Sequence, residues 1–152
     1  MNLRKYGFIK VGKWILNKNN KSGIDFELND LNKERVIYAF VVDGKTKYIG
    51  ICESNKRTLE DRMKMFKNKQ GGGTNERIAD EIKKCLEDGK TVEIFALKPE
   101  LSVVYKGPEI TIEYNHYTEI VVKNKSIEVD LIRGLEYPLI ERLKPEWNIK
   151  KN

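Results

Sequence analysis

One stretch in the first half of the chain limits the possible folds more than any other. Residues 36–42 (Val-Ile-Tyr-Ala-Phe-Val-Val) are all apolar, and the run is too short for a core helix. It therefore predicts a strand buried on both faces. The pair at 43–44, Asp-Gly, tolerates the positive φ angles of a tight hairpin, and residues 45–51 return as the second strand. The hairpin places Tyr38 and Tyr48 on neighbouring strands, either as caps of the core or as walls of a site.

The size and composition of the chain are those of one soluble globular domain. Its 152 residues suffice for a core, and 34% of them are charged. No apolar run approaches the roughly 20 residues of a membrane span, and no signal peptide follows Met1. Cys52 and Cys85 fit reduced thiols, so we expect a cytoplasmic protein. A formal charge of +6 permits a polyanionic partner without identifying one.

Strand and helix patterns surround the central hairpin. Before it, residues 8–16 predict a strand interrupted at Gly12, and the alternating residues 24–28 predict a second strand. These two strands would form a hairpin that flanks the main sheet. After the central hairpin, Thr58 begins a capping-box pattern for a helix that runs to about Lys69.

A second helix and a third strand complete this pattern. The glycines at 71–73 lack the Lys-Ser/Thr sequel of a phosphate-binding loop, so they predict a linker. Thr74 or Asn75 would then cap a helix that ends at Gly89, and residues 91–97 predict a strand of the central sheet. The expected fold is α+β: a small central antiparallel-rich β-sheet flanked by helices, with an N-terminal β-hairpin.

Residues 101–130 interrupt this order of helices and strands. Their alternating apolar positions predict an inserted β-meander, in which His116, the only histidine, has a structural role. We therefore expect a single domain, 1–152, made of three parts: an N-terminal β elaboration (1–34), a core (35–100 and 131–149) and a β insertion (101–130).

The last predicted helix carries an unusual side chain. The helix begins near residue 135, or begins earlier and kinks at Pro138. Glu136 lies on its apolar stripe, so that carboxylate must be paired, hydrogen-bonded or bound to a metal ion. Glu141 and Glu146 show no such conflict and should be solvated. Four residues predict that the helix packs on the core: Leu135, Leu139, Ile140 and Leu143.

Residues from the hairpin, the first helix and the C-terminal segment together resemble the motif of the GIY-YIG nuclease family. Val36-Ile37-Tyr38 corresponds to the first triplet and Tyr48-Ile49-Gly50 to the second, ten residues apart from tyrosine to tyrosine. Arg62 falls where the family's arginine lies. Glu136 corresponds to the metal-binding glutamate, and Asn148, twelve residues later, to the asparagine that closes the pattern.

Two positions depart from the family pattern. Val36 stands where the first glycine of the family name lies, so a close backbone approach at that point is not expected here. Phe66 stands where a histidine is often found four residues after the arginine, so this position looks structural. The residues for the metal ion and the phosphate are all present, and the similarity covers about residues 35–149 without the insertion.

The resemblance implies a metal-dependent endonuclease that hydrolyses phosphodiester bonds of DNA, in restriction or in DNA repair. Glu136 would hold Mg²⁺ or Mn²⁺, because one carboxylate with several waters is a natural magnesium site. Arg62 would donate hydrogen bonds to the phosphate. Asn148 would hold the glutamate or a tyrosine in place.

A tyrosine would act on the attacking water in this scheme. Tyr38 or Tyr48 would orient the water or deprotonate it. A tyrosine normally titrates near pH ~10, so a base role requires cations that lower its pKa. Lys45 and Lys47 on the hairpin are candidates for those cations.

A cluster of basic residues surrounds the first predicted helix. It is either an ordinary solvated surface or a track for double-stranded DNA, and the adjacent phosphate site favours the track. A homodimer is compatible with the sequence, which shows no self-complementary surface. With the two hairpin lysines, Lys45 and Lys47, the expected nucleic-acid contacts are Lys56, Arg57, Lys64, Lys67, Lys69 and Arg77.

Two other functions compete with the nuclease. A catalytically silent nucleic-acid-binding module would keep the fold without turnover, but the complete set of five motif residues argues against it. A structural or protein-interaction domain would use the tyrosines as core caps and Glu136 in a buried ion pair. That hypothesis leaves the joint spacing of the residues unexplained.

Overall fold

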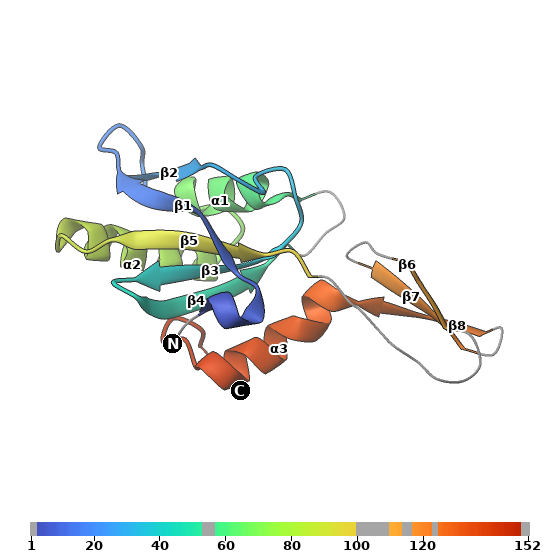
Figure 1. Ribbon diagram of the computed structural model, residues 1–152. Helices are drawn as coiled ribbons and strands as arrows, with labels where there is room; N and C mark the ends of the chain where they lie inside the picture. Colours follow the sequence, from blue (N-terminus) through green and yellow to red (C-terminus); the bar gives the residue numbers. More distant parts are fainter. Residues whose placement is uncertain (1–2, 53–56, 100–109, 114–116, 123–124, 150–152) are drawn as a thin grey trace.

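The computed structural model describes residues 3–52, 57–99, 110–113, 117–122 and 125–149. The expected α+β class is confirmed: five antiparallel strands form a sheet in the order β2-β1-β5-β3-β4, with helices on both faces (Figure 1). The elements in chain order are η1 (Leu3–Tyr6), β1 (Ile9–Leu16), β2 (Ile24–Leu28), β3 (Ile37–Val42), β4 (Lys45–Ile51), α1 (Leu59–Lys67), α2 (Gly73–Glu87), β5 (Val92–Leu97), β6 (Ile110–Glu113), β7 (Tyr117–Val122), β8 (Lys125–Asp130) and α3 (Leu131–Leu143).

The central hairpin has the predicted form. All six residues of β3 are buried, and the strand lies between β5 and β4. Asp43 and Gly44 both have positive φ angles, 46° and 82°, as a two-residue turn that follows the twist of the strands requires. The apolar run is therefore a two-faced central strand because both of its faces are covered.

Alternate residues of β3 belong to two separate hydrophobic cores. Tyr38 and Phe40 pack with residues of α1 and α2, such as Phe66, on one face of the sheet. Ile37 and Ala39 pack with residues of η1 and α3 on the other face. Side chains alternate across a strand, so this one strand joins both layers (Figure 1).

The N-terminal hairpin corrects two predictions. Strand β1 pairs with β5, so β1 and β2 extend the main sheet rather than flank it. The strand is also not interrupted at Gly12: it continues through a register shift between Lys10 and Gly12. A Cβ atom added at Gly12 would lie 2.0 Å from the carbonyl oxygen of Glu27. Glycine is therefore needed there for close strand pairing, not to end the strand.

The two helices after the hairpin begin in different ways. Thr58 caps α1 in a capping box with Asp61, as predicted. Helix α2 begins at Gly73 after an N-cap residue, Gly72, that has no side chain to offer, so the prediction of a Thr74 or Asn75 cap is wrong. The Asn75 side chain points back to the α1–α2 connection and is engaged there.

The last helix begins earlier than residue 135, the second of the two predicted possibilities. Asp130 caps α3 through the main-chain N–H of Arg133 at 3.1 Å, and Pro138 lies inside the helix on an exposed side. The prediction that Leu135 packs on the core is wrong, because it is 37% exposed at the flank of the apolar stripe. Ile132 and Leu139 are the buried residues of this helix.

Part of the predicted insertion forms a second sheet. Strands β6, β7 and β8 pair antiparallel in that order. Figure 1 shows this sheet extending from the start of α3, away from the five-stranded sheet. Residues 101–109 of the predicted meander and His116 lie outside the described residues, and the single-domain organisation stays a prediction. None of the described helices is long and apolar enough to cross a membrane.

Candidate active site

A cleft of about 550 Å³ opens at the β4 edge of the five-stranded sheet. Helices α1, α2 and α3 and the segment after α3 all contribute walls. Four of the five predicted catalytic residues line the cleft although they are far apart in the sequence: Tyr48, Arg62, Glu136 and Asn148. The fifth, Tyr38, is fully buried behind it.

The two tyrosines have different surroundings. Tyr48 is 7% exposed and lines the cleft, whereas Tyr38 has no exposed surface. The ring of Tyr38 packs against Gly50: a Cβ atom added there would lie 2.4 Å from the Tyr38 hydroxyl oxygen. Tyr48 is therefore the tyrosine that a molecule in the cleft can touch, and Tyr38 forms the wall behind it.

Burial raises the pKa of Tyr48, while the guanidinium of Arg62 opposes this effect, the Glu136 carboxylate adds to it, and Arg77 lowers the pKa. The net direction is upward, so the phenol is neutral at pH 7. Arg62 and Arg77 are thus the cations that lower the Tyr48 pKa most, and the suggested role of Lys45 and Lys47 stays a prediction. Lys47 lies at the register shift of β4, between the paired residues Thr46 and Tyr48, and forms an ion pair with Glu146.

Arg62 is held in a defined orientation. Its Nη1 donates a hydrogen bond to Oδ1 of Asn75 at 3.1 Å. The guanidinium carbon lies 4.8 Å from the centroid of the Phe66 ring, which is fully buried, in accordance with the structural role expected for that position. This cation–π contact and the hydrogen bond to Asn75 together restrain the position of the guanidinium.

Glu136 is half-buried and faces the cleft from α3. It follows Ile132 by four residues and precedes Ile140 by four, which keeps it on the side of the helix that faces the sheet. Glu136 is the only acidic residue among the described residues that line the cleft. No group of three or more His, Cys, Asp or Glu side chains with metal-binding geometry exists in the described part of the chain.

The side chain of Asn148 forms two hydrogen bonds with the main chain of β4. Its Oδ1 accepts from the Ile49 N–H at 2.9 Å, and its Nδ2 donates to the Ile49 carbonyl at 2.8 Å. Trp147 N–H donates to the Lys47 carbonyl at 2.7 Å, and Arg77 donates to the Trp147 carbonyl at 2.9 Å. Asn148 is predicted to hold the glutamate or a tyrosine in place; its two hydrogen bonds reach neither side chain and instead hold the main chain next to Tyr48.

The predicted basic track separates into two groups. Arg57 and Arg77 line the cleft with Arg62, and none of the three forms an ion pair among the described residues. The lysines lie outside the cleft: Lys64, Lys67 and Lys69 face Glu60, Asp25 and Asp80 at 3.8, 3.1 and 2.7 Å.

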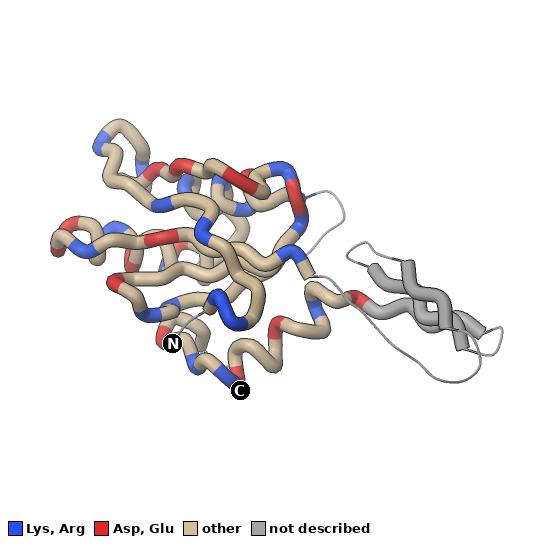
Figure 2. Tube along the Cα trace, in the orientation of Figure 1, with Lys and Arg blue, Asp and Glu red and all other residues tan. Residues whose placement is uncertain are grey.

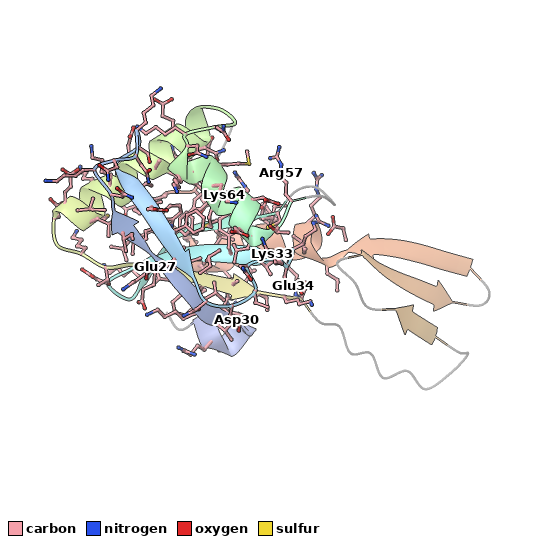
Figure 3. All side chains as sticks on the ribbon, turned by 90° about the horizontal axis from the view of Figure 1, so that it is seen from above. Glu27, Asp30, Lys33, Glu34, Arg57 and Lys64 are labelled. Carbon is pink, nitrogen blue, oxygen red and sulfur yellow. The ribbon has the colours of Figure 1, made fainter. Side chains whose placement is uncertain are left out.

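The remaining predicted nucleic-acid contacts are Lys45 and Lys56, and Lys45 is not among the described residues that line the cleft. Lys45 is exposed at the hairpin turn, and Lys56 lies outside the described residues. Figure 2 shows basic and acidic positions interspersed along the main body, and Figure 3 shows Arg57 and Lys64 on the α1 side of the molecule. Arg57, Arg62 and Arg77 thus line the cleft, whereas the ion-paired lysines Lys64, Lys67 and Lys69 lie outside it.

One residue of the site was not identified from the sequence. Asn75 lines the cleft and contacts Arg62, but beside three glycines it has the pattern of a helix cap. Its neighbour Thr74 also lines the cleft. No local signal in the sequence distinguishes an asparagine that caps a helix from one that reaches across to another helix.

Comparison with known proteins shows the fold. No protein-family description and no curated protein sequence matches the chain. A solved structure of a mutant of bacteriophage T4 EndoII is similar, with a TM-score of 0.63 and 21% sequence identity over 96% of this chain and 95% of that chain. The restriction endonuclease HPY188I in complex with product DNA gives a TM-score of 0.49 and 16% identity, over 97% of this chain and 79% of that chain. The chain therefore shares the fold of T4 EndoII over nearly its whole length.

Proposed function

We propose that this protein is a metal-dependent endonuclease that hydrolyses phosphodiester bonds of DNA in the cleft beside β4. The observation that carries the proposal is the meeting of Tyr48, Arg62 and Glu136 in one cleft from three separate elements. The resemblance of these residues to the GIY-YIG motif and the fold shared with T4 EndoII support it.

The three cleft arginines suit a phosphodiester substrate. Guanidinium groups are always charged and donate in a planar fork that matches phosphate oxygens. Arg57, Arg62 and Arg77 line the cleft with one carboxylate, Glu136. The cleft therefore has an excess of positive charge, which favours a polyanion over a neutral or cationic ligand.

The donor set in the cleft fits a hydrated divalent cation. Mg²⁺ keeps much of its hydration and is commonly bound through one or two carboxylates, and Mn²⁺ accepts similar ligands. Glu136 would hold the ion in a cleft of about 550 Å³, which has room for its waters. When bound, such an ion polarises a phosphate oxygen and stabilises charge on the leaving oxygen.

Three side chains of the cleft have separate roles in the proposed hydrolysis. Arg62 binds the scissile phosphate and neutralises charge that grows on its oxygens. Tyr48, neutral at pH 7, orients a water molecule for attack on phosphorus. As the new P–O bond forms, the attacking water releases a proton to solvent; the bond to the 3′-oxygen breaks, and that oxygen takes up a proton from solvent. Asn148 keeps the backbone beside Tyr48 in register through its two hydrogen bonds to Ile49.

Incubation of the protein with supercoiled plasmid tests the proposal. With Mg²⁺ we expect nicked or linear product, and with EDTA we expect none. Nicked circles would indicate cutting of single strands, and defined fragments would indicate sequence-specific cutting as in restriction. Retained gel shift without any cleavage under a range of Mg²⁺ and Mn²⁺ concentrations would contradict the proposal and favour the silent binding module.

A further inference from the structure

We infer that Asn75, in the first turn of α2, is a positioning residue that aims the Arg62 guanidinium at the scissile phosphate. This inference rests on the proposed function. Asn75 is 3% exposed, yet both ends of its carboxamide are used. Nδ2 donates to the Gln70 carbonyl at 2.5 Å, and Oδ1 accepts from Arg62 at 3.1 Å.

The contact with Gln70 determines which end of the carboxamide faces Arg62. A main-chain carbonyl can only accept, so the amide nitrogen must point to Gln70 and the amide oxygen to Arg62. Gln70 is itself fixed, because its N–H donates to the Met65 carbonyl at 2.8 Å. Asn75 thereby ties the guanidinium of Arg62 to the main chain of the α1–α2 connection.

The connection is shaped to let Asn75 approach this closely. Gly71 has a φ angle of +87°, and a Cβ atom there would lie 2.6 Å from Cε of Met65 and 2.9 Å from Nδ2 of Asn75. A side chain at residue 71 would therefore push the carboxamide away. The glycine that resembled part of a linker is a requirement of this contact.

The contact leaves Arg62 ready for a phosphate. Asn75 accepts from one nitrogen, and the guanidinium carbon lies over the Phe66 ring. The other N–H groups make no hydrogen bond to an oxygen or nitrogen atom among the described residues. A neutral asparagine orients the charge without neutralising it, whereas an aspartate would compete with the phosphate. The pre-oriented fork needs no reorganisation as the transition state forms.

A double-mutant cycle on DNA cleavage tests whether Asn75 acts through Arg62. We expect Asn75→Ala to lower kcat by about 10- to 100-fold with little change in KM, because a misplaced catalytic group costs rate rather than binding. In the Arg62→Ala background the same substitution should change kcat less than about twofold. An equal loss in both backgrounds, or wild-type kcat in Asn75→Ala, would overturn the inference. Asn68→Ala, an exposed position at the end of α1, is the matched control.

A second measurement examines the contact without using activity. Side-chain NMR of Arg62 should show hindered rotation of the guanidinium in the wild type and faster rotation in Asn75→Ala. Unchanged rotation would overturn the positioning role even if cleavage falls. Hindered rotation in a wild type that does not cleave DNA would contradict the proposed function. The contact between Asn75 and Arg62 would then exist but would have no role in catalysis.

A further variant tests the contact through charge, and the NMR measurement on the wild type remains if Asn75→Ala does not fold. Asn75→Asp keeps the volume and the acceptor, loses the donor to the Gln70 carbonyl and adds a negative charge beside Arg62. We expect weaker DNA binding, with a salt dependence reduced by about one phosphate contact. Wild-type affinity and cleavage in Asn75→Asp would overturn the inference.

Discussion

Residue 50 has only a hydrogen atom as its side chain, and the ring of Tyr38 occupies the space beside it. A Cβ atom at Gly50 would lie 2.4 Å from both Cζ and the hydroxyl oxygen of Tyr38. Residue 50, in the second triplet, must therefore be glycine because the ring of Tyr38, in the first triplet, fills the space that a side chain would need. Val36, where the resemblance would place a glycine, is fully buried in the core that includes Tyr38. At that position the chain uses a packed side chain rather than a close backbone approach.

The ionisation of Tyr38 should limit stability at high pH. Burial raises its pKa well above the usual value, with smaller contributions from Tyr48, which raises it, and Arg62, which lowers it. Because the folded pKa exceeds the unfolded pKa of about 10, this contribution to stability is complete below pH ~10 and is lost as the pH rises further. The loss approaches about 1.4 kcal/mol per pH unit.

Urea unfolding of wild type and Tyr38→Phe between pH 8 and pH 11 measures this effect. The difference in free energy of unfolding between the two proteins should be constant up to pH ~10 and should then shift in favour of the variant. Tyr48→Phe provides the comparison, since its pKa is also raised but its ring reaches the cleft. A difference that stays constant up to pH 11 would contradict the buried, neutral state of Tyr38.

Among the elements, the segment after α3 connects the two faces of the sheet. Helix α3 packs with the core that contains Ile37, whereas Trp147 belongs to the core that contains Tyr38. Between them the chain crosses the β4 edge, where Asn148 and Trp147 bond to the main chain. This crossing covers part of an edge strand that would otherwise present unpaired groups.

Asn148→Ala should loosen β4 beside Tyr48. The variant loses two hydrogen bonds, each with a net contribution of about 0.5–1.5 kcal/mol, so we expect a stability loss of about 1–3 kcal/mol and slower cleavage. Urea denaturation with an unchanged m-value would measure the first effect, and the plasmid assay the second. Asn29→Ala, at an exposed position, is the control. Wild-type stability in Asn148→Ala would show that the crossing segment does not depend on this side chain.

Local patterns in the sequence account for much of the fold and part of the site. The hairpin, the Thr58 capping box and the apolar stripe that carries Glu136 are read over a few neighbouring residues, and the structure contains all three. The placement of β5 between β1 and β3 depends on pairing between distant segments, for which no local pattern exists. The role of Asn75 has no local pattern for the same reason, because its partner, Arg62, lies on another helix.

For the whole molecule, the distribution of charge predicts where DNA would bind under the proposed function. Lysines on the outer surface face acidic residues of the same chain, while Arg57, Arg62 and Arg77 gather in the cleft. Exposed ion pairs are weak, so the outer lysines remain available to some extent. The three cleft arginines, which form no ion pair within the described part of the chain, should nevertheless make the stronger phosphate contacts.

The salt dependence of DNA binding measures this difference. Each phosphate contact adds about 0.9 to the slope of log affinity against log salt concentration. Arg57→Ala should reduce the magnitude of that slope by about one, whereas Lys18→Ala, at the exposed β1–β2 turn, should leave it nearly unchanged. Equal changes from both variants would indicate that the basic surface attracts DNA without a preferred path.

The most direct test of the proposed active site is the single-turnover rate of Mg²⁺-dependent plasmid cleavage by Glu136→Gln. This change keeps the shape of the side chain and removes the one acidic group that lines the cleft in the described part of the chain. We predict a loss of at least about a hundredfold, with gel-shift affinity in EDTA retained and near-normal cleavage by the matched variant Glu141→Gln on the same helix. Cleavage by Glu136→Gln at the wild-type rate would contradict the account.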